Sequence, residues 1–161
     1  MIRLARPEDM PALMNIYAAA RRFMAATGNP HQWPEGHPSA DMLAADIAAG
    51  DLYVEERNGV PHAAFAFIIG EDPTYGYIED GAWLSDSSYG TIHRLASDGT
   101  APGFFGRCVA FCHSRMSHLR VDTHRDNRVM QHLAEKEGFT RCGIIYLANG
   151  SPRIAYERMD G

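Results

Sequence analysis

The sequence has few cysteines and no long hydrophobic run. Only three of its 161 residues are cysteines, an odd number and too few for a disulfide framework in a chain of this length. The longest uninterrupted apolar run covers residues 63–69, far short of the roughly 20 residues that a helix needs to cross a bilayer. These absences argue against a disulfide-stabilised scaffold and a membrane-spanning helix, and they fit a reducing compartment.

Basic residues are scarce relative to acidic ones. Fifteen lysines and arginines against twenty aspartates and glutamates give a formal net charge of −5. Without a basic tract, the chain is a poor candidate for binding nucleic-acid phosphates. The first nine residues include four charged side chains and therefore leave no apolar stretch for a signal peptide; these are Arg3, Arg6, Glu8 and Asp9. We therefore expect a cytoplasmic protein without nucleic-acid or membrane partners.

The sequence does contain an alternation of strand-like and helix-like segments, which indicates an α/β class. Hydrophobic residues make up 45% and charged residues 22%, and no repeat or composition break divides the chain, so we expect a single domain over residues 1–161. Strands are expected at residues 2–5, 52–57, 62–69, 91–97, 119–123, 141–147 and 153–159. Helices are expected at about residues 7–27, 39–50, 104–116 and 127–137.

Two kinds of connection predict a mixed sheet. Residues 91–123 and 119–147 each show the order strand, helix, strand, which predicts a parallel pair with a right-handed crossover in both. The dipeptides Asn58-Gly59 and Asn149-Gly150 predict hairpins, and hence antiparallel pairs.

The most informative segment is the glycine-rich run SDGTAPGFFG at residues 97–106, which follows a strand and opens a helix. Glycines there let backbone N–H groups converge, and the helix N-terminus adds positive potential, so the loop suits a pyrophosphate. A plain strand-to-helix turn needs the same glycines for its geometry. The loop by itself therefore leaves both interpretations open.

Further motifs surround this loop. Asn127 opens the next helix, which closes with Gly138-Phe139, and the chain carries QW at 32, GAW at 81, HRLAS at 93, DTHRDN at 122 and CGIIY at 142. With these motifs and this element order, the chain resembles the GNAT acetyltransferase superfamily over essentially its whole length. More narrowly, it resembles a bacterial subgroup of mostly uncharacterised members. The resemblance implies a three-layer α/β fold with a mixed, partly splayed central sheet and about four helices.

The resemblance also implies acetyl-CoA as cosubstrate. Backbone groups of the strand near Leu95 and Ser97 would hold the pantetheine arm, and Asn127 would bond that arm from the next helix. The amides that would face the pyrophosphate are those of Ala101, Gly103, Phe104, Phe105 and Gly106.

The chain departs from the family's pattern in two places. In the loop, Thr100 stands for the usual arginine or glutamine, Phe105 stands for the final small residue, and Pro102 has no N–H. We expect fewer donors and more crowding there, with Arg107 either restoring a positive charge or lying solvated on its helix. The tyrosine that serves many members as general acid is replaced by Ala134, which cannot transfer a proton.

Acetyl transfer to an amine needs a base for the amine's proton and an acid for the leaving thiolate. His93, on the strand that leads into the loop, is the first candidate base, and Glu79 is the second. Tyr146 is the candidate to replace the missing acid. Each residue also has a purely structural interpretation. His93 could be a half-buried histidine that bonds a backbone carbonyl, Glu79 a solvated surface carboxylate and Tyr146 an aromatic residue of the core. Asp122 and His124 alternate along one strand face and could pair, either for chemistry or to orient the start of the adjacent helix.

Acidic residues predict where the acceptor binds. Residues 71–86 hold five carboxylates and no lysine or arginine, so they would attract a cationic amine or form a solvated loop. Trp33 and Trp83 either wall the acceptor pocket or anchor the core. With Asp80 they are the predicted substrate-binding residues.

One helix raises the question of a metal site. Cys108, Cys112 and His113 lie within two turns, but the cysteines belong to an apolar face. No second cysteine pair completes a zinc shell, so we expect buried cysteines and no metal. The apolar face comprises Phe104, Cys108, Phe111, Cys112 and Met116.

The leading hypothesis is an acetyl-CoA-dependent N-acetyltransferase that moves an acetyl group to a primary amine by direct transfer in a ternary complex. The acceptor would be a small molecule or a peptide. The alternative is a non-catalytic acyl-CoA-binding sensor or interaction module, and a third hypothesis is loss of CoA binding altogether. Product formation separates the first two. The last strands offer edges that could pair in a homodimer, although nothing in the sequence requires one.

Overall fold

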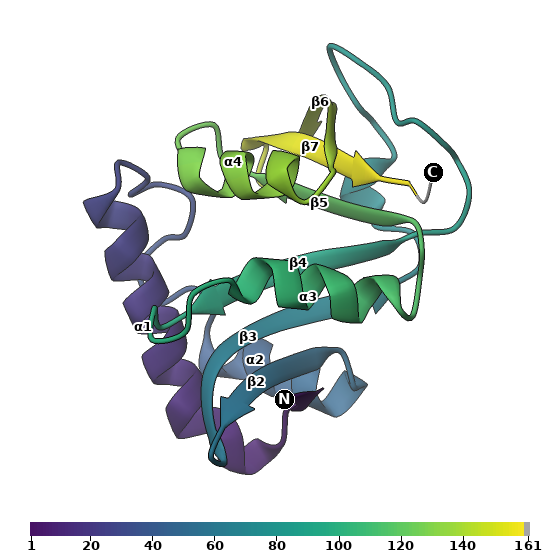
Figure 1. The fold of residues 1–161 in the computed structure, drawn as a ribbon. Helices are drawn as coiled ribbons and strands as arrows, with labels where there is room; N and C mark the ends of the chain where they lie inside the picture. The colour runs from purple at the N-terminus through teal and green to yellow at the C-terminus, as the bar shows by residue number, and fades with distance from the viewer. Residues whose placement is uncertain (160–161) are drawn as a thin grey trace.

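The computed structural model describes residues 1–159, through which one seven-stranded sheet runs (Figure 1). The strands are β1 Ile2–Leu4, β2 Leu52–Arg57, β3 Val60–Ile69, β4 Gly90–Ser97, β5 Leu119–Thr123, β6 Thr140–Tyr146 and β7 Pro152–Arg158. The helices are α1 Met10–Ala26, α2 Ala40–Ala49, α3 Phe104–His113 and α4 Arg128–Lys136, with 3-10 turns η1 Pro7–Asp9 and η2 Pro73–Tyr75. The element order expected from the sequence is confirmed.

The sheet is mixed, in the order β1-β2-β3-β4-β5-β7-β6. β1 to β4 pair antiparallel in sequence, and β4 and β5 form the expected parallel pair. The second expected parallel pair is wrong, because β7 lies between β5 and β6 and pairs antiparallel with both. The second strand of the β6–β7 hairpin, β7, pairs with β5, so β6 lies one strand farther out.

Helices cover both faces of the sheet and give three layers. Because side chains alternate along a strand, Phe65 and Phe67 of β3 pack with α3, whereas Ala64 and Ala66 pack with α1. Figure 1 shows α3 and α4 on the near side of the sheet and α2 behind it. The predicted apolar face of α3 lies in the first of these cores, with its cysteines fully buried.

The connection between β3 and β4, residues 70–89, covers the part of the sheet that the helices leave bare. Tyr75 and Tyr89 of this segment pack against Ile145 and Ala155 of β6 and β7. The segment also runs along the outer edge of β6. There a Cβ on Gly81 would lie 1.9 Å from a carbonyl oxygen of β6, so only glycine allows this approach.

Capping residues lie at the helix ends that the sequence predicts. The hydroxyl of Ser39 accepts from the backbone N–H of Met42 at the start of α2, and Gly50 ends that helix in the left-handed conformation. The side chain of Asn127 accepts from the N–H of Met130 and caps α4. These local contacts fix where α2 begins and ends and where α4 begins.

Candidate functional site

β4 and β5 separate soon after they meet. Only Gly90 with Leu119 and Thr91 with Arg120 are paired. Beyond Thr91, the β4 backbone therefore has a strand partner on its β3 side alone. Leu95, a predicted pantetheine contact, lies on this stretch, and so does Ser97 at its end. An extended molecule with amide groups can add to such a strand edge as a further strand would.

The separation of β4 from β5 leaves an opening in the sheet, and a bulge interrupts β4 beside this opening. Ala64 and Ala66 of β3 face Ala96 and His93, so β4 has one extra residue there. Arg94 takes a left-handed φ of +49°. Two contacts with the N-terminal helices hold the bulge. The hydroxyl of Tyr17 on α1 donates to the Arg94 carbonyl at 2.6 Å. The Arg94 guanidinium binds the carboxylate of Asp46 on α2. Both N-terminal helices thus fix the strand at the point where it turns.

The glycine-rich loop leads from β4 into α3 at the wide end of the opening. Gly103 is the N-cap with φ +83°, a conformation that glycine adopts at no steric cost. The next three amides, those of Phe104, Phe105 and Gly106, belong to the first helical turn, where N–H groups have no intrahelical acceptor. Asp98 stabilises the loop by accepting from the amide and hydroxyl of Thr100. These features fit an anion.

The expected crowding of this loop by aromatic rings is wrong. Phe104 and Phe105 are 5% and 4% exposed, and the ring of Phe105 packs on Phe139 in the core. Their side chains point away from the turn because α3 buries its apolar face against the sheet. Ala101 is also buried. The ring of Phe105 therefore lies in the core and does not fill the loop.

Arg107 is an exposed residue of α3, as the second interpretation from the sequence has it, but it is also paired. Its guanidinium makes two hydrogen bonds to the buried carboxylate of Glu55, at 2.9 and 2.8 Å, and a third to the carbonyl of Pro102. The hydrogen bonds from Arg107 lower the pKa of Glu55. Arg107 thus links the glycine-rich loop to Glu55 on β2, and the Glu55 carboxylate largely neutralises the positive charge of Arg107.

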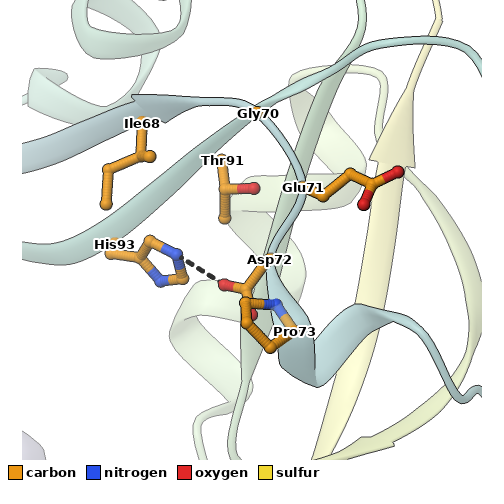
Figure 2. Close-up of a pocket in the computed structure, with 7 residues that line it drawn as sticks. All are labelled: Ile68, Gly70, Glu71, Asp72, Pro73, Thr91 and His93. Atoms are coloured by element: carbon orange, nitrogen blue, oxygen red, sulfur yellow. Dashed lines mark ion pairs between the residues drawn. The ribbon is translucent and has the colours of Figure 1, made fainter.

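His93 forms a dyad with Asp72. Nε2 of His93 lies 3.0 Å from Oδ2 of Asp72, and both side chains are largely buried (Figure 2). Burial raises the pKa of Asp72, but hydrogen bonds from His93 and Thr74 outweigh it and lower the pKa from 3.8 to about 2. An ionised Asp72 favours the proton on Nε2 of His93. Nδ1 then has an unprotonated lone pair, which is what a general base needs.

Tyr75 and Asp122 form a second pair next to this dyad. The Tyr75 hydroxyl donates to Oδ2 of Asp122 at 2.6 Å, and the Tyr75 ring lies 6.5 Å from that of His93. Burial raises the pKa of Asp122 and, with the nearby Asp122 charge, that of Tyr75. The possible pair of Asp122 with His124 does not form, because each residue has another partner. β5 ends before His124, whose Nδ1 accepts from the N–H of Asp126.

Glu79 and Tyr146 are brought together, but away from His93. The Tyr146 hydroxyl donates to Oε2 of Glu79 at 3.1 Å, a hydrogen bond that raises the pKa of Tyr146. Glu79 bridges to Ile144 on the outer edge of β6. With strands about 4.8 Å apart, it lies roughly 14 Å from β5. The catalytic roles given to these two residues stay predictions, and His93 lies nearer the opening.

The predicted acceptor residues lie in three different surroundings. Trp33 packs between Tyr17 and His37, with ring centroids 5.8 Å apart in both cases. Trp83 packs on Tyr75 and donates its indole N–H to the Tyr75 carbonyl. Asp80 is exposed beside the outer edge of β6. Of the three, only Trp83 lines a hollow described below.

Two hollows share the short ridge at residues 71–73. One, of about 140 Å³, is lined by Ile68, Gly70, Glu71, Asp72, Pro73, Thr91 and His93 (Figure 2). The other is an open groove of about 830 Å³ that also includes Trp83, Asp86, Tyr89 and Arg120. Arg120 contributes little charge to the groove, because its guanidinium lies between two aromatic rings and binds the buried carboxylate of Glu157. Glu71, Asp72 and Asp86 therefore make the groove acidic.

Gln32 ties the loop after α1 to the far side of the opening. Its side-chain oxygen accepts from Asn29, Asn127 and Thr123, at 2.9, 2.9 and 3.3 Å. Its backbone carbonyl accepts from Arg153 of β7. The amide of Asn127, the predicted cofactor contact on α4, is thus held by this loop.

Sequence reasoning found His93 and missed the residues around it. Asp72 stands in the sequence DPT, which predicts a turn closed by its carboxylate, and Oδ1 does accept from Thr74. No local signal links Asp72 to His93, or Tyr75 to Asp122.

Comparisons with solved structures find the same fold. A GNAT-family acetyltransferase from Streptococcus agalactiae is 32% identical, with a TM-score of 0.83 over 100% of this chain and 95% of that one. A putative acetyltransferase from Staphylococcus aureus is 24% identical, with a TM-score of 0.69 over 99% and 98%. GphF, a GNAT-like decarboxylase in complex with isobutyryl-CoA, shares the fold at 15% identity and a TM-score of 0.68 over 99% and 98%.

The likeness to the streptococcal acetyltransferase, with the opened sheet and the glycine turn, supports an acyl-CoA-dependent acyltransferase in general terms. The chain belongs to the GNAT acetyltransferase family, since the identity to the streptococcal protein extends over its whole length. No family model and no curated protein matches the sequence. Among the helices at residues 1–159, none has the length and apolar character to cross a membrane.

Proposed function

We propose that the protein is an acetyl-CoA-dependent N-acetyltransferase, which moves an acetyl group directly to a primary amine in a ternary complex. The observation that carries this proposal is the His93–Asp72 dyad, which lies where β4 leaves β5 and lines a small hollow. A base in this position is within reach of both a molecule in the opening and an acceptor in the hollow. His93 is therefore the general base of the proposed reaction.

The residues at the opening fit acetyl-CoA. Leu95 and Ser97 lie on the unpaired side of β4 and would hold the pantetheine arm, with Asn127 across the opening. The amides of Ala101, Gly103, Phe104, Phe105 and Gly106 would face the pyrophosphate at the start of α3. When bound, acetyl-CoA supplies an activated acetyl group on a sulfur that can leave.

The protein's own part in the reaction is to handle the amine's proton. Nδ1 of His93 accepts it, while Asp72 holds Nε2–H and stabilises the imidazolium that forms. Ala134 is completely buried in the core, so no side chain at that position can protonate the thiolate. The protonated His93, or water in the open groove, is the proton source that this site offers.

The acidic ridge supports a cationic acceptor. Glu71 and Asp72 border both hollows, and Asp86 lines the larger one. Exposed carboxylates in a concave surface raise the local concentration of amines in their protonated form. The dyad then removes the proton that would block attack.

The first test is thermal unfolding with and without acetyl-CoA, with ATP as a control. A ligand at one hundred times its dissociation constant adds about 2.7 kcal/mol, which corresponds to a midpoint rise of roughly 5–11 °C for a chain of this size. We expect a rise with acetyl-CoA and none with ATP. No rise at saturating acetyl-CoA would contradict the proposal.

The second test is release of CoA with a panel of primary amines. His93→Gln should abolish the release that the wild type shows, whereas His132→Gln, on the exposed side of α4, is the matched control and should not. Binding of acetyl-CoA without release for any amine would instead favour the sensor.

A further inference from the structure

Asp122 on β5 lies across the opening from His93 on β4. The two strands are parallel, and Thr91 of β4 is the register partner of Arg120 of β5. His93 and Asp122 each lie two residues beyond that pair, so they occupy matching positions on one face of the sheet. The alternate positions of both strands pack in the core with α3. The side chains of His93 and Asp122 therefore face away from that helix.

One short turn reaches both residues. The turn is η2, with Asp72 as its N-cap and Tyr75 as its last residue. Asp72 binds Nε2 of His93 at 3.0 Å, and the Tyr75 hydroxyl donates to Oδ2 of Asp122 at 2.6 Å. The ring of Tyr75 lies 6.5 Å from that of His93. The turn thus connects a carboxylate on each side of the opening to the surroundings of one histidine.

The charge of Asp122 lies in surroundings that oppose it. Burial raises the pKa of Asp122, whereas the hydrogen bond from Tyr75 and the nearby charges of His93 and Arg153 lower it. The guanidinium of Arg153 donates its hydrogen bonds to groups at the start of β7 and in the loop after α1. The fold thus keeps a carboxylate at a cost in stability, which is common where a charge serves an active site.

We infer that Asp122 is a positioning residue for the proposed reaction, whose negative charge favours the imidazolium that His93 becomes when it accepts the amine's proton. This inference rests on the proposed function, because it takes His93 as the base. The proton leaves the amine nitrogen and binds Nδ1 of His93, while Asp122 stays ionised and touches neither the amine nor the ring. Its charge acts across the opening, where little water screens it.

Other charged groups near His93 act differently. Asp72 favours the same imidazolium through a direct hydrogen bond, and it also sets the tautomer. Glu71 borders the small hollow, but it is exposed to water and ions that screen its charge. The hydroxyl of Tyr75 is neutral, because burial raises its pKa well above the ordinary value. Tyr75 therefore holds the Asp122 carboxylate in place and adds no charge of its own.

The test is Asp122→Asn, which removes the charge and keeps an oxygen that can accept from Tyr75. The rate of CoA release in a single turnover, with an amine that the wild type acetylates, should fall about 10- to 100-fold. The dissociation constant for acetyl-CoA should stay within about threefold of the wild-type value. Asp41→Asn removes the same charge from the exposed first turn of α2 and is the matched control. It should keep the wild-type rate.

Two further measurements separate an effect of the charge from a structural role. At pH 7, Asp122→Asn should unfold at the same or a higher temperature than the wild type, and a clear fall would overturn the inference. Tyr75→Phe removes the hydrogen bond but leaves the carboxylate, so its rate should fall less than that of Asp122→Asn. The opposite order would show that the hydrogen bond carries the effect, and it would also overturn the inference.

The same assay distinguishes the two proposals. If the wild type releases no CoA with any amine, the proposed function fails and the role of Asp122 fails with it. If the wild type releases CoA and Asp122→Asn does so at an unchanged rate, only the role of Asp122 fails.

Discussion

Replacing Asp72 by asparagine should give His93 the wrong tautomer. Oδ1 of Asp72 accepts from both the N–H and the hydroxyl of Thr74, at 2.8 and 2.6 Å. Because an N–H can only donate, the amide oxygen of asparagine has to take the Oδ1 position, and its NH2 group then faces His93. Nε2 must accept from this NH2, so the ring proton moves to Nδ1. Nδ1 can then no longer take a proton from the amine.

The size of the effect follows from the role of the base. A positioned general base contributes about 10²–10⁴ in rate, and the same inversion of a histidine tautomer in a serine-protease triad costs about 10⁴. We expect Asp72→Asn to lower kcat by about 10²–10⁴. Asp72→Ala removes the orienting carboxylate but imposes no tautomer, so it should lose less activity than Asp72→Asn.

The assay is CoA release at saturating acetyl-CoA with an amine from the panel. Nitrogen-15 chemical shifts of His93 report which ring nitrogen carries the proton, and thermal unfolding shows that each variant is folded. The expected order of activity is wild type, Asp72→Ala, Asp72→Asn. A kcat for Asp72→Asn within threefold of the wild type, or a larger loss for Asp72→Ala, would refute the tautomer explanation.

Four stability predictions follow from buried or close-packed groups. Glu157→Gln leaves the buried Arg120 without its charged partner, so it should cost about 3–5 kcal/mol and lower the unfolding midpoint by roughly 6–20 °C in calorimetry. Burial raises the pKa of Asp122, so its charged form destabilises the fold above that pKa; Asp122→Asn should raise the midpoint at pH 7, and this gain should vanish near pH 4. The folded protein lowers the pKa of Asp72 from 3.8 to about 2, so the ionised carboxylate stabilises the fold above about pH 4. In acid unfolding, the wild type should lose this stabilisation between about pH 4 and 2. The Asp72→Asn variant should show no such loss. Gly81→Ala places a Cβ 1.9 Å from a carbonyl oxygen of β6, and it should lower the midpoint and speed amide hydrogen exchange in β6; an unchanged midpoint would contradict the close approach.

The fold could be predicted from the sequence largely because its signals are local. Ser39 and Asn127 cap helices, Gly50 ends one, and Asn58-Gly59 turns a hairpin, each through contacts within a few residues. The insertion of β7 between β5 and β6 could not be predicted in this way. A hairpin specifies that β6 and β7 pair, but not which of them also pairs with β5.

The candidate site was predictable only in part. His93 stood out because a histidine leads into the glycine loop, and the structure brings it to the opening. Glu79 and Tyr146 do meet, but at the outer edge of the sheet. Their position depends on the path of residues 70–89 around β6, which no pattern in that segment specifies.

The sequence by itself determined the strands, the helices, their caps and the motifs of the GNAT family, because these depend on residues close together in the chain. Only the tertiary structure decided which side chains meet. Tyr75 and Asp122, 47 positions apart, and Asp72 and His93 become partners because residues 70–89 fold over the bare face of the sheet.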